Sequence, residues 1–268
     1  MANSVHEVRR HPAVQLLGRA GMVCYGIVHV LLAALTVQVV LGDSDQQTDQ
    51  KGAVATIAEA PFGVVLLWIV AIGLFAFAVW QAALAASGYS WVTEKRKRLF
   101  RRISAGVRAV AGVAIGIAAI TYAVGGSSSD SGSQQQTLTA KVLAMPGGQF
   151  LVGIAALVVI GVGVNQIRKG VKKSFKDDLN MSELPQGTQK TVERLGQVGF
   201  IGKGIAIATI GVLVGLAAIF ADPNQSGGMD KALHTLAGQP YGVVVLIVIA
   251  LGFVGYGGYC FAAAKAHK

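Results

Sequence analysis

The chain has 268 residues, of which 53% are apolar and 13% charged, and its mean hydropathy is +0.57. This composition is too apolar for an ordinary water-soluble domain. The net charge of +10 raises the question of nucleic-acid binding. However, no basic stretch has interleaved aromatic residues or a recognisable nucleic-acid-binding module, so we expect no nucleic-acid partner.

Six apolar stretches follow one another along the chain, and each is long enough to cross the hydrocarbon core of a bilayer, which takes about 20 residues. Any one of them could be a buried helix of a soluble protein. Six in succession, separated by charged or polar loops, make that interpretation the weaker one. The sequence therefore predicts transmembrane helices over residues 20–41, 62–86, 103–125, 148–167, 198–221 and 240–264.

A Pro-x-Gly motif opens every second predicted helix, and its three copies are 85 and 94 residues apart. A regular internal spacing identifies the repeated structural unit. Here the unit is a hairpin of two transmembrane helices, with repeats at residues 1–90, 91–175 and 176–268. We expect an all-α fold in which a pseudo-threefold axis along the membrane normal relates the repeats, because all three run in the same direction. The motif residues are Pro61, Gly63, Pro146, Gly148, Pro240 and Gly242.

A short segment precedes each Pro-x-Gly motif, and its apolar residues recur at i, i+3 and i+4. This spacing predicts a helix of one or two turns that lies on the outer membrane surface. The proline is then expected to be the first residue of the next helix, where its missing N–H costs nothing. The apolar positions are Val54, Ile57 and Ala58 in the first repeat, Thr139, Val142 and Leu143 in the second, and Leu233, Leu236 and Ala237 in the third.

Two connecting loops have distinct compositions. Residues 125–136 contain mainly Gly, Ser and Gln, which predicts a flexible linker on the outer side. Residues 168–194 mix lysines with acidic residues, and we expect this loop to lie on the inner surface, partly helical, near anionic lipid. The alternative for the second loop is that it docks a partner.

The positive charges lie in alternate loops, with 20 of the 23 Lys and Arg residues on one side of the predicted spans. The positive-inside rule makes that side cytoplasmic. We therefore expect a multi-pass protein of a bacterial cell membrane with both termini in the cytoplasm. The candidate contacts with anionic lipid headgroups are Arg19, Lys95, Arg96, Lys97, Arg98, Arg101, Arg102, Arg168, Lys169, Lys172 and Lys173.

These motifs can be compared with two known repeat architectures. Mitochondrial-type carriers also have three two-helix repeats, but their Pro-x-acid-x-x-base signature lies at the inner ends of the odd helices, whereas here the prolines precede the even helices. Over residues 15–264, the alternating charge, the Pro-x-Gly motifs and the three degenerate copies instead resemble an actinobacterial-type family of three-repeat integral membrane proteins, domain of unknown function 1206. The resemblance implies a six-helix architecture and brings no activity and no catalytic residues.

Small residues should set the packing between the helices. Lipid tails are as apolar as leucine, so membrane helices associate through close backbone approach rather than through water exclusion. Two GxxxG motifs, at residues 112–116 and 211–215, lie in the third and fifth predicted helices. We expect them to mark packing inside the protein, with homo-oligomerisation as the alternative.

Polar residues are few within the predicted spans, and His29 is the most informative of them. An ionisable group at membrane depth is a functional candidate by default. His29 is either proton-sensitive or ligand-contacting, or it is a neutral histidine hydrogen-bonded to a neighbouring helix, and we favour the second interpretation. The other intramembrane polar residues, which can form interhelical hydrogen bonds or line a solvated path, are Gln38, Gln81, Asn165 and Gln166. Arg19, Arg108 and Lys203 lie near enough to the inner boundary to extend to the headgroups.

No constellation of residues points to an enzyme. The spans contain no pair of carboxylates, no HExxH motif and no Walker A motif, and only one intramembrane histidine, so we expect no catalytic residues, no metal and no cofactor. The preferred hypothesis is an accessory or scaffold protein that contacts lipids and other membrane proteins. The alternatives are a channel or carrier for a small or lipidic solute and, more weakly, a lipid-modifying enzyme.

Overall fold

The computed structural model describes residues 12–42, 47–87, 93–126, 131–180, 182 and 184–266, and this part of the chain is helical throughout, as expected. The six long helices are α2 (Pro12–Leu41), α4 (Gly63–Ser87), α5 (Lys95–Ala123), α7 (Gly148–Val171), α8 (Gln186–Phe220) and α10 (Gly242–Ala266). The short helices are α3 (Gln50–Ala58), α6 (Ser131–Leu143) and α9 (Met229–Ala237), with 3-10 turns η1 (Ser174–Asp178) and η3 (Pro223–Gln225).

All six long helices are long and apolar enough to cross a membrane, with apolar segments of 24 to 34 residues, so the chain is a multi-pass membrane protein. Three of them begin earlier than the apolar pattern predicted, and the first, α2, starts at Pro12 rather than near residue 20. α5 starts at Lys95 rather than near residue 103, and α8 starts at Gln186 rather than near residue 198. Lys, Arg, Glu and Gln are good helix formers, so both helices continue past their apolar parts.

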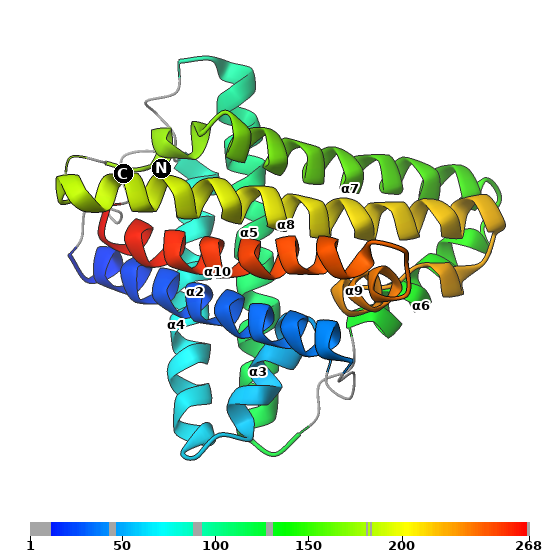
Figure 1. Ribbon diagram of the computed structural model, residues 1–268, viewed down its shortest axis with the longest axis horizontal. Helices are drawn as coiled ribbons and strands as arrows, with labels where there is room; N and C mark the ends of the chain where they lie inside the picture. The colour runs from blue at the N-terminus through cyan, green and yellow to red at the C-terminus, as the bar shows by residue number, and fades with distance from the viewer. Residues whose placement is uncertain are drawn as a thin grey trace.

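The three repeats share most of their helix pairing. α4 packs on α5, α7 on α8 and α10 on α2, so the second helix of each repeat contacts the first helix of another repeat. α2 also packs on α4, and α8 on α10, within their own repeats. In the described part of the chain, however, α5 and α7 do not pack along each other. Figure 1 shows α7, α8, α10 and α2 side by side, while α4 and α5 run across them. The arrangement therefore departs from the predicted pseudo-threefold axis.

Two glycines of α7 mark the side of the helix that packs on α8. Gly163 and Gly170 both face α8, where a Cβ added to Gly163 would lie 2.7 Å from the Gly204 carbonyl oxygen. The side chains of Leu157 and Val158 are 70% and 60% exposed on the remainder of the helix. α7 makes its close backbone approach on α8, while the opposite side, which carries Leu157 and the uncrowded Gly153 and Gly161, is left open.

α8 and α10 also pack through glycines. A Cβ added to Gly202 would lie 2.6 Å from the Gly252 Cα, and one added to Gly252 would lie 2.5 Å from the Gly202 Cα. The predicted GxxxG motifs likewise face helices of the same chain, since Gly112 contacts Leu74 on α4 and Gly211 contacts Ile160 on α7. These motifs pack inside the protein.

The Pro-x-Gly motif forms the same turn in every repeat, and it differs from the predicted one. The prolines precede the helices, which begin at Gly63, Gly148 and Gly242. The residue between proline and glycine has a positive φ in each copy, +62° at Phe62, +74° at Gly147 and +64° at Tyr241. In the first repeat the Gly63 N–H then donates to the Ala60 carbonyl, 2.8 Å away, and equivalent bonds close the other two turns. The glycine is required because a Cβ would collide with a carbonyl of the preceding short helix.

The first turn predicts how a substitution at Phe62 should behave. A left-handed backbone conformation costs an L-residue about 1–2 kcal/mol, and β-branched residues tolerate it least. Phe62 is 84% exposed, so Phe62→Gly should leave the thermal stability in detergent unchanged or slightly higher, while Phe62→Val should lower it. Phe150→Val, at an exposed position inside α7, is the matched control. Equal melting temperatures for Phe62→Val and Phe150→Val would contradict the backbone strain at Phe62.

The predicted linker at residues 125–136 is wrong in its second half. Residues 131–136 form the first turns of α6 instead, and residues 127–130 lie outside the described residues. Gln136 Nε2 donates to the Ser226 carbonyl, 3.1 Å away, which ties this helix to the η3 turn. Composition suggested flexibility, but this tertiary hydrogen bond and the continuation of the amphipathic helix order the segment. The helices predicted before each Pro-x-Gly motif are confirmed as α3, α6 and α9, with α6 longer than expected, and their position on the outer membrane surface stays a prediction.

Candidate functional site

The main polar cluster inside the helices joins three of them, and we call it the lysine cluster: Tyr25 and His29 from α2, Lys203 from α8 and Tyr256 from α10. Lys203 Nζ lies 3.1 Å from the Tyr25 hydroxyl and 3.1 Å from His29 Nε2. It also lies 4.0 Å from the centre of the Tyr256 ring, within the range of a cation–π interaction. The cluster therefore connects the first repeat to the third.

Close helix packing brings these side chains together. The Gly202–Gly252 contact draws α8 onto α10, and a Cβ added to Gly257 would lie 2.9 Å from the Gly26 carbonyl oxygen of α2. The side chains of a helix lean toward its N-terminus. Lys203 therefore extends back along α8 to reach Tyr256, which lies beyond Gly252 along α10.

Hydrogen-bond chemistry fixes the roles of the groups in the cluster. His29 Nδ1 lies 2.9 Å from the backbone carbonyl oxygen of Tyr25, and a carbonyl can only accept. Nδ1 therefore carries the proton, and the lone pair of Nε2 accepts from the Lys203 ammonium. The three N–H groups of Lys203 thus have the hydroxyl of Tyr25, the imidazole of His29 and the ring of Tyr256 as acceptors. His29 is neutral and hydrogen-bonded to a neighbouring helix, which is the interpretation that we favoured.

Aromatic rings surround the lysine cluster. Phe77 of α4 stacks on Tyr25 with ring centres 4.5 Å apart, and Phe200 of α8 meets Tyr256 at 5.3 Å. His29 has no exposed surface. The cluster can pin α2, α8 and α10 together around one charge.

The other predicted polar residues do not join this cluster. Gln38 is half-buried on α2, and Asn165 and Gln166 are half-buried on α7, which packs on α8 rather than on α2 or α4. Gln81 is fully buried on α4, and neither its Oε1 nor its Nε2 has a hydrogen-bond partner among the described residues. Together with His29, these four residues therefore lie on three helices, α2, α4 and α7, rather than around one path.

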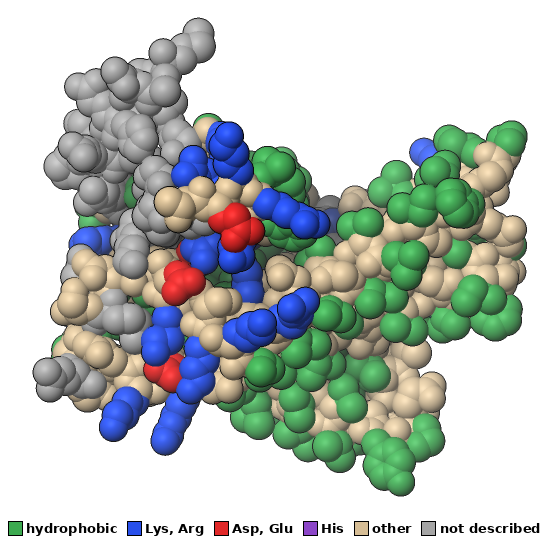
Figure 2. Space-filling view, turned by 90° about the horizontal axis from the view of Figure 1, so that it is seen from above, with side chains coloured by type: hydrophobic (Ala, Val, Ile, Leu, Met, Phe, Trp, Pro, Cys, Tyr) green, Lys and Arg blue, Asp and Glu red, His purple; other side chains and the backbone are tan. Residues whose placement is uncertain are grey.

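The predicted lipid-contacting cations lie at one end of the molecule, which we call the basic end: the end where α8 begins and α10 ends. Figure 2 shows Lys and Arg gathered toward this end and apolar side chains elsewhere. Arg101 bridges α5 to η1, with its guanidinium 2.5 Å from Asp178 and 3.2 Å from Asp177. Of the predicted contacts, the exposed ones are Arg19, Lys95, Arg96, Lys97, Arg168 and Lys172, and the half-buried ones are Arg98, Arg101, Arg102, Lys169 and Lys173. Arg9, Arg10 and Lys268 lie outside the described residues.

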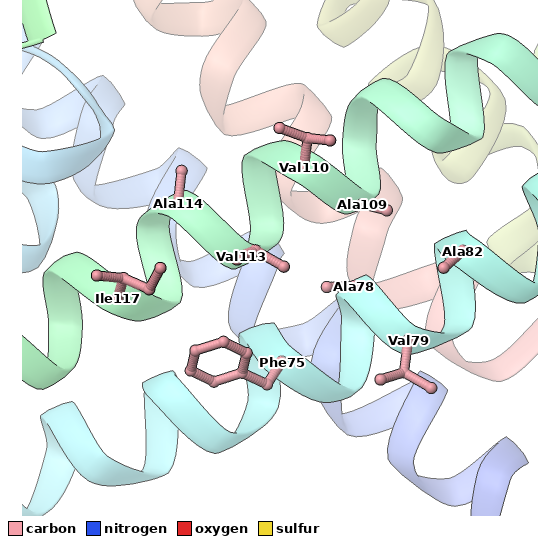
Figure 3. A pocket seen from close by; sticks show the side chains of 9 residues that line it. All are labelled: Phe75, Ala78, Val79, Ala82, Ala109, Val110, Val113, Ala114 and Ile117. Carbon is pink, nitrogen blue, oxygen red and sulfur yellow. The ribbon is translucent and has the colours of Figure 1, made fainter.

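An apolar groove of about 460 Å³ runs between α4 and α5. Figure 3 shows that its walls come from facing turns of the two helices. Arg102 lies beyond one end of the groove and donates to the backbone carbonyls of Ala85 and Ala86, the last turn of α4. The lining residues are Phe75, Ala78, Val79, Ala82, Ala109, Val110, Val113, Ala114 and Ile117.

Sequence reasoning missed the central role of Lys203 and predicted that it extends to the headgroups. The signal was present, since Lys203 stands between two glycines inside an apolar run, where a charge needs partners. Tyr25 occupies the same position in the first repeat as Lys203 does in the third, so the repeat alignment places the two at equivalent depths. It does not show that their side chains meet.

Comparison with known proteins agrees with this architecture. The chain is 32% identical over 248 residues to the "Uncharacterized protein YxxB" of Bacillus subtilis (strain 168), which covers 92% of this chain and 89% of the relative. No solved structure matches the chain. A family described as Domain of Unknown Function (DUF1206) matches three times, at residues 20–88, 103–173 and 198–267. These three matches fall on the three helical hairpins of the fold, and the chain belongs to the DUF1206 family.

Proposed function

We propose that this protein is a non-enzymatic accessory or scaffold subunit of the membrane, which contacts anionic lipid at its basic end and another membrane protein along α7. The observation that carries the proposal is where the polar and apolar groups of the protein lie. The intramembrane charge of Lys203 is used to join helices, whereas α7 leaves bulky apolar side chains outside. We propose further that the basic end faces the cytoplasm of a bacterial cell.

The α7 surface suits a protein partner because of its place in the repeat. The equivalent helices, α4 and α10, each pack between two other long helices, but α7 packs closely on α8 alone among the long helices described. Leu151, Leu157 and Val158 are more than half exposed on its outer side. If the three repeats formed a closed ring, α5 would pack on this side of α7. A helix of a partner protein would occupy that position instead.

A carrier for a small solute is the second candidate, and Gln81 is the observation that favours it. A buried amide without partners costs free energy, which a polar solute or water could offset. The separation of Asn165 and Gln166 on α7 from His29 on α2 weighs toward the accessory role, because a carrier path needs these groups to converge.

Photo-cross-linking in native membranes tests the proposal. A benzophenone amino acid at Leu157 of α7 should give a discrete protein adduct, whereas one at Leu251 of α10, which is 58% exposed, should give lipid adducts only. The masses of the adducts distinguish a second copy of this chain from another protein. Lipid adducts alone at both positions would contradict the accessory role, and solute flux in proteoliposomes that depends on Gln81 would favour the carrier instead.

A further inference from the structure

We infer that the groove between α4 and α5 binds one acyl chain of an anionic phospholipid, whose headgroup lies against the basic first turns of α5. This inference rests on the lipid-contacting part of the proposed function and is independent of a protein partner at α7. It assigns a defined lipid site to a surface that sequence reasoning treated only as a general attraction between cations and headgroups.

The shape and lining of the groove fit a lipid chain. All nine lining residues are apolar, and four of them are alanines, whose small side chains create the hollow between larger neighbours. Phe75 lies toward one end of the groove, on the α4 wall (Figure 3). A stretch of α-helix about 12 Å long and 10 Å wide would occupy about 900 Å³. The groove holds about 460 Å³, which suits a thin acyl chain, whereas a helix would lie largely outside it.

The groove also lies within the reach of an acyl chain whose headgroup is at the start of α5. The apolar part of α5 begins at Ile103, directly after Arg101 and Arg102. At a rise of about 1.5 Å per residue, Val113 in the middle of the groove is about 16 Å from Arg102 along the helix axis. Half of a hydrocarbon core is about 15 Å thick. An acyl chain about 15 Å long with its headgroup at Arg102 therefore reaches the groove if it runs along α5.

Charge selects the headgroup. Residues 94–102 contain six cations and one acid, Glu94, which pairs with Lys97 at 2.7 Å. Arg102 binds the last carbonyls of α4 beyond one end of the groove, while Arg101 is engaged by Asp177 and Asp178. The exposed side chains of Lys95 and Arg96 add positive charge one to two turns closer to the N-terminus of α5. A phosphodiester with net negative charge matches this end better than a zwitterionic headgroup does.

Native mass spectrometry of the full-length protein, titrated with phosphatidylglycerol or phosphatidylcholine in detergent, tests the inference. The wild type should retain one phosphatidylglycerol in preference to phosphatidylcholine. Filling the groove with Ala82→Leu and Ala114→Leu, both at exposed positions, should weaken that binding about tenfold, a factor equal to about 1.4 kcal/mol. Lys95→Gln with Arg96→Gln should remove the preference between the two lipids.

Matched controls separate the site from general effects. Ala34→Leu adds the same side chain at an exposed position on α2, and Lys141→Gln removes a positive charge from an exposed position on α6, which is not among the candidate lipid contacts. Neither control should change the binding of the first lipid. A loss with the charge variants but not with the groove variants would show a diffuse basic surface and overturn the inference. So would equal retention of both lipids by the wild type, or a protein adduct at a benzophenone placed at Val79. None of these results would affect the cross-link expected at Leu157.

Discussion

Replacing Gly252 by alanine is expected to destabilise the protein by about 1–3 kcal/mol, the usual cost of overpacking a close contact. The new Cβ would lie 2.5 Å from the Cα of Gly202, a backbone atom that cannot rotate away. α8 and α10 would have to separate, and their separation would also move Lys203 away from Tyr256. Thermal unfolding in detergent, followed by circular dichroism, measures the change in melting temperature.

Gly161 provides the matched control for this substitution. It lies in α7, and a Cβ built on it meets no atom within 4 Å. Alanine is the better helix former, so Gly161→Ala should leave the stability unchanged or raise it by up to about 1 kcal/mol. If the two alanine variants melted at the same temperature, the Gly202–Gly252 contact would not determine how α8 and α10 pack.

Loss of His29 is expected to have the second large effect. In His29→Leu the Lys203 ammonium keeps its charge inside the bundle but loses one of its three acceptors, which should cost about 2–3 kcal/mol. In Lys203→Met the charge itself is removed, and the cost should be smaller, about 1–2 kcal/mol for the polar groups of Tyr25 and His29 left unpaired. We therefore expect His29→Leu to lower the free energy of unfolding more than Lys203→Met does.

A double-mutant cycle distinguishes this pairing from two independent packing defects. The variant with both substitutions should be more stable, by at least about 1 kcal/mol, than the sum of the two single effects predicts. Lys172→Met, which removes an exposed lysine at the basic end, should have little effect on the unfolding free energy. Additive effects of His29→Leu and Lys203→Met would show that the 3.1 Å contact contributes no coupling.

The elements were predictable because each has a local signal. Apolar runs of about 20 residues identified the six spans, and the i, i+3, i+4 spacing identified α3, α6 and α9. The turn before each even helix was predicted incorrectly because proline is usual at the first position of a helix. In this turn the next residue instead adopts a positive φ, even where it is Phe62 or Tyr241.

The pairing of the helices was not predictable in the same way. In a membrane, the lipid-facing and protein-facing sides of a helix are both apolar, so the sequence pattern does not separate them. Leu157, which is exposed, and Leu246, which is fully buried, are the same residue type in equivalent kinds of helix. His29 and Lys203 are separated by 174 residues, and nothing in the local sequence of either indicates the other. The lysine cluster therefore emerged only from the three-dimensional structure.

The packing of α10 on α2 has a consequence for biosynthesis. α2 cannot complete its contacts until α10 has been inserted, because Gly26 and Val30 of α2 pack against Gly257 of α10. Before α10 is inserted, the Lys203 ammonium lacks its contact with the Tyr256 ring. The side of α2 that packs on α10 then faces lipid. The packing of the first repeat is therefore completed only by the last helix of the third repeat.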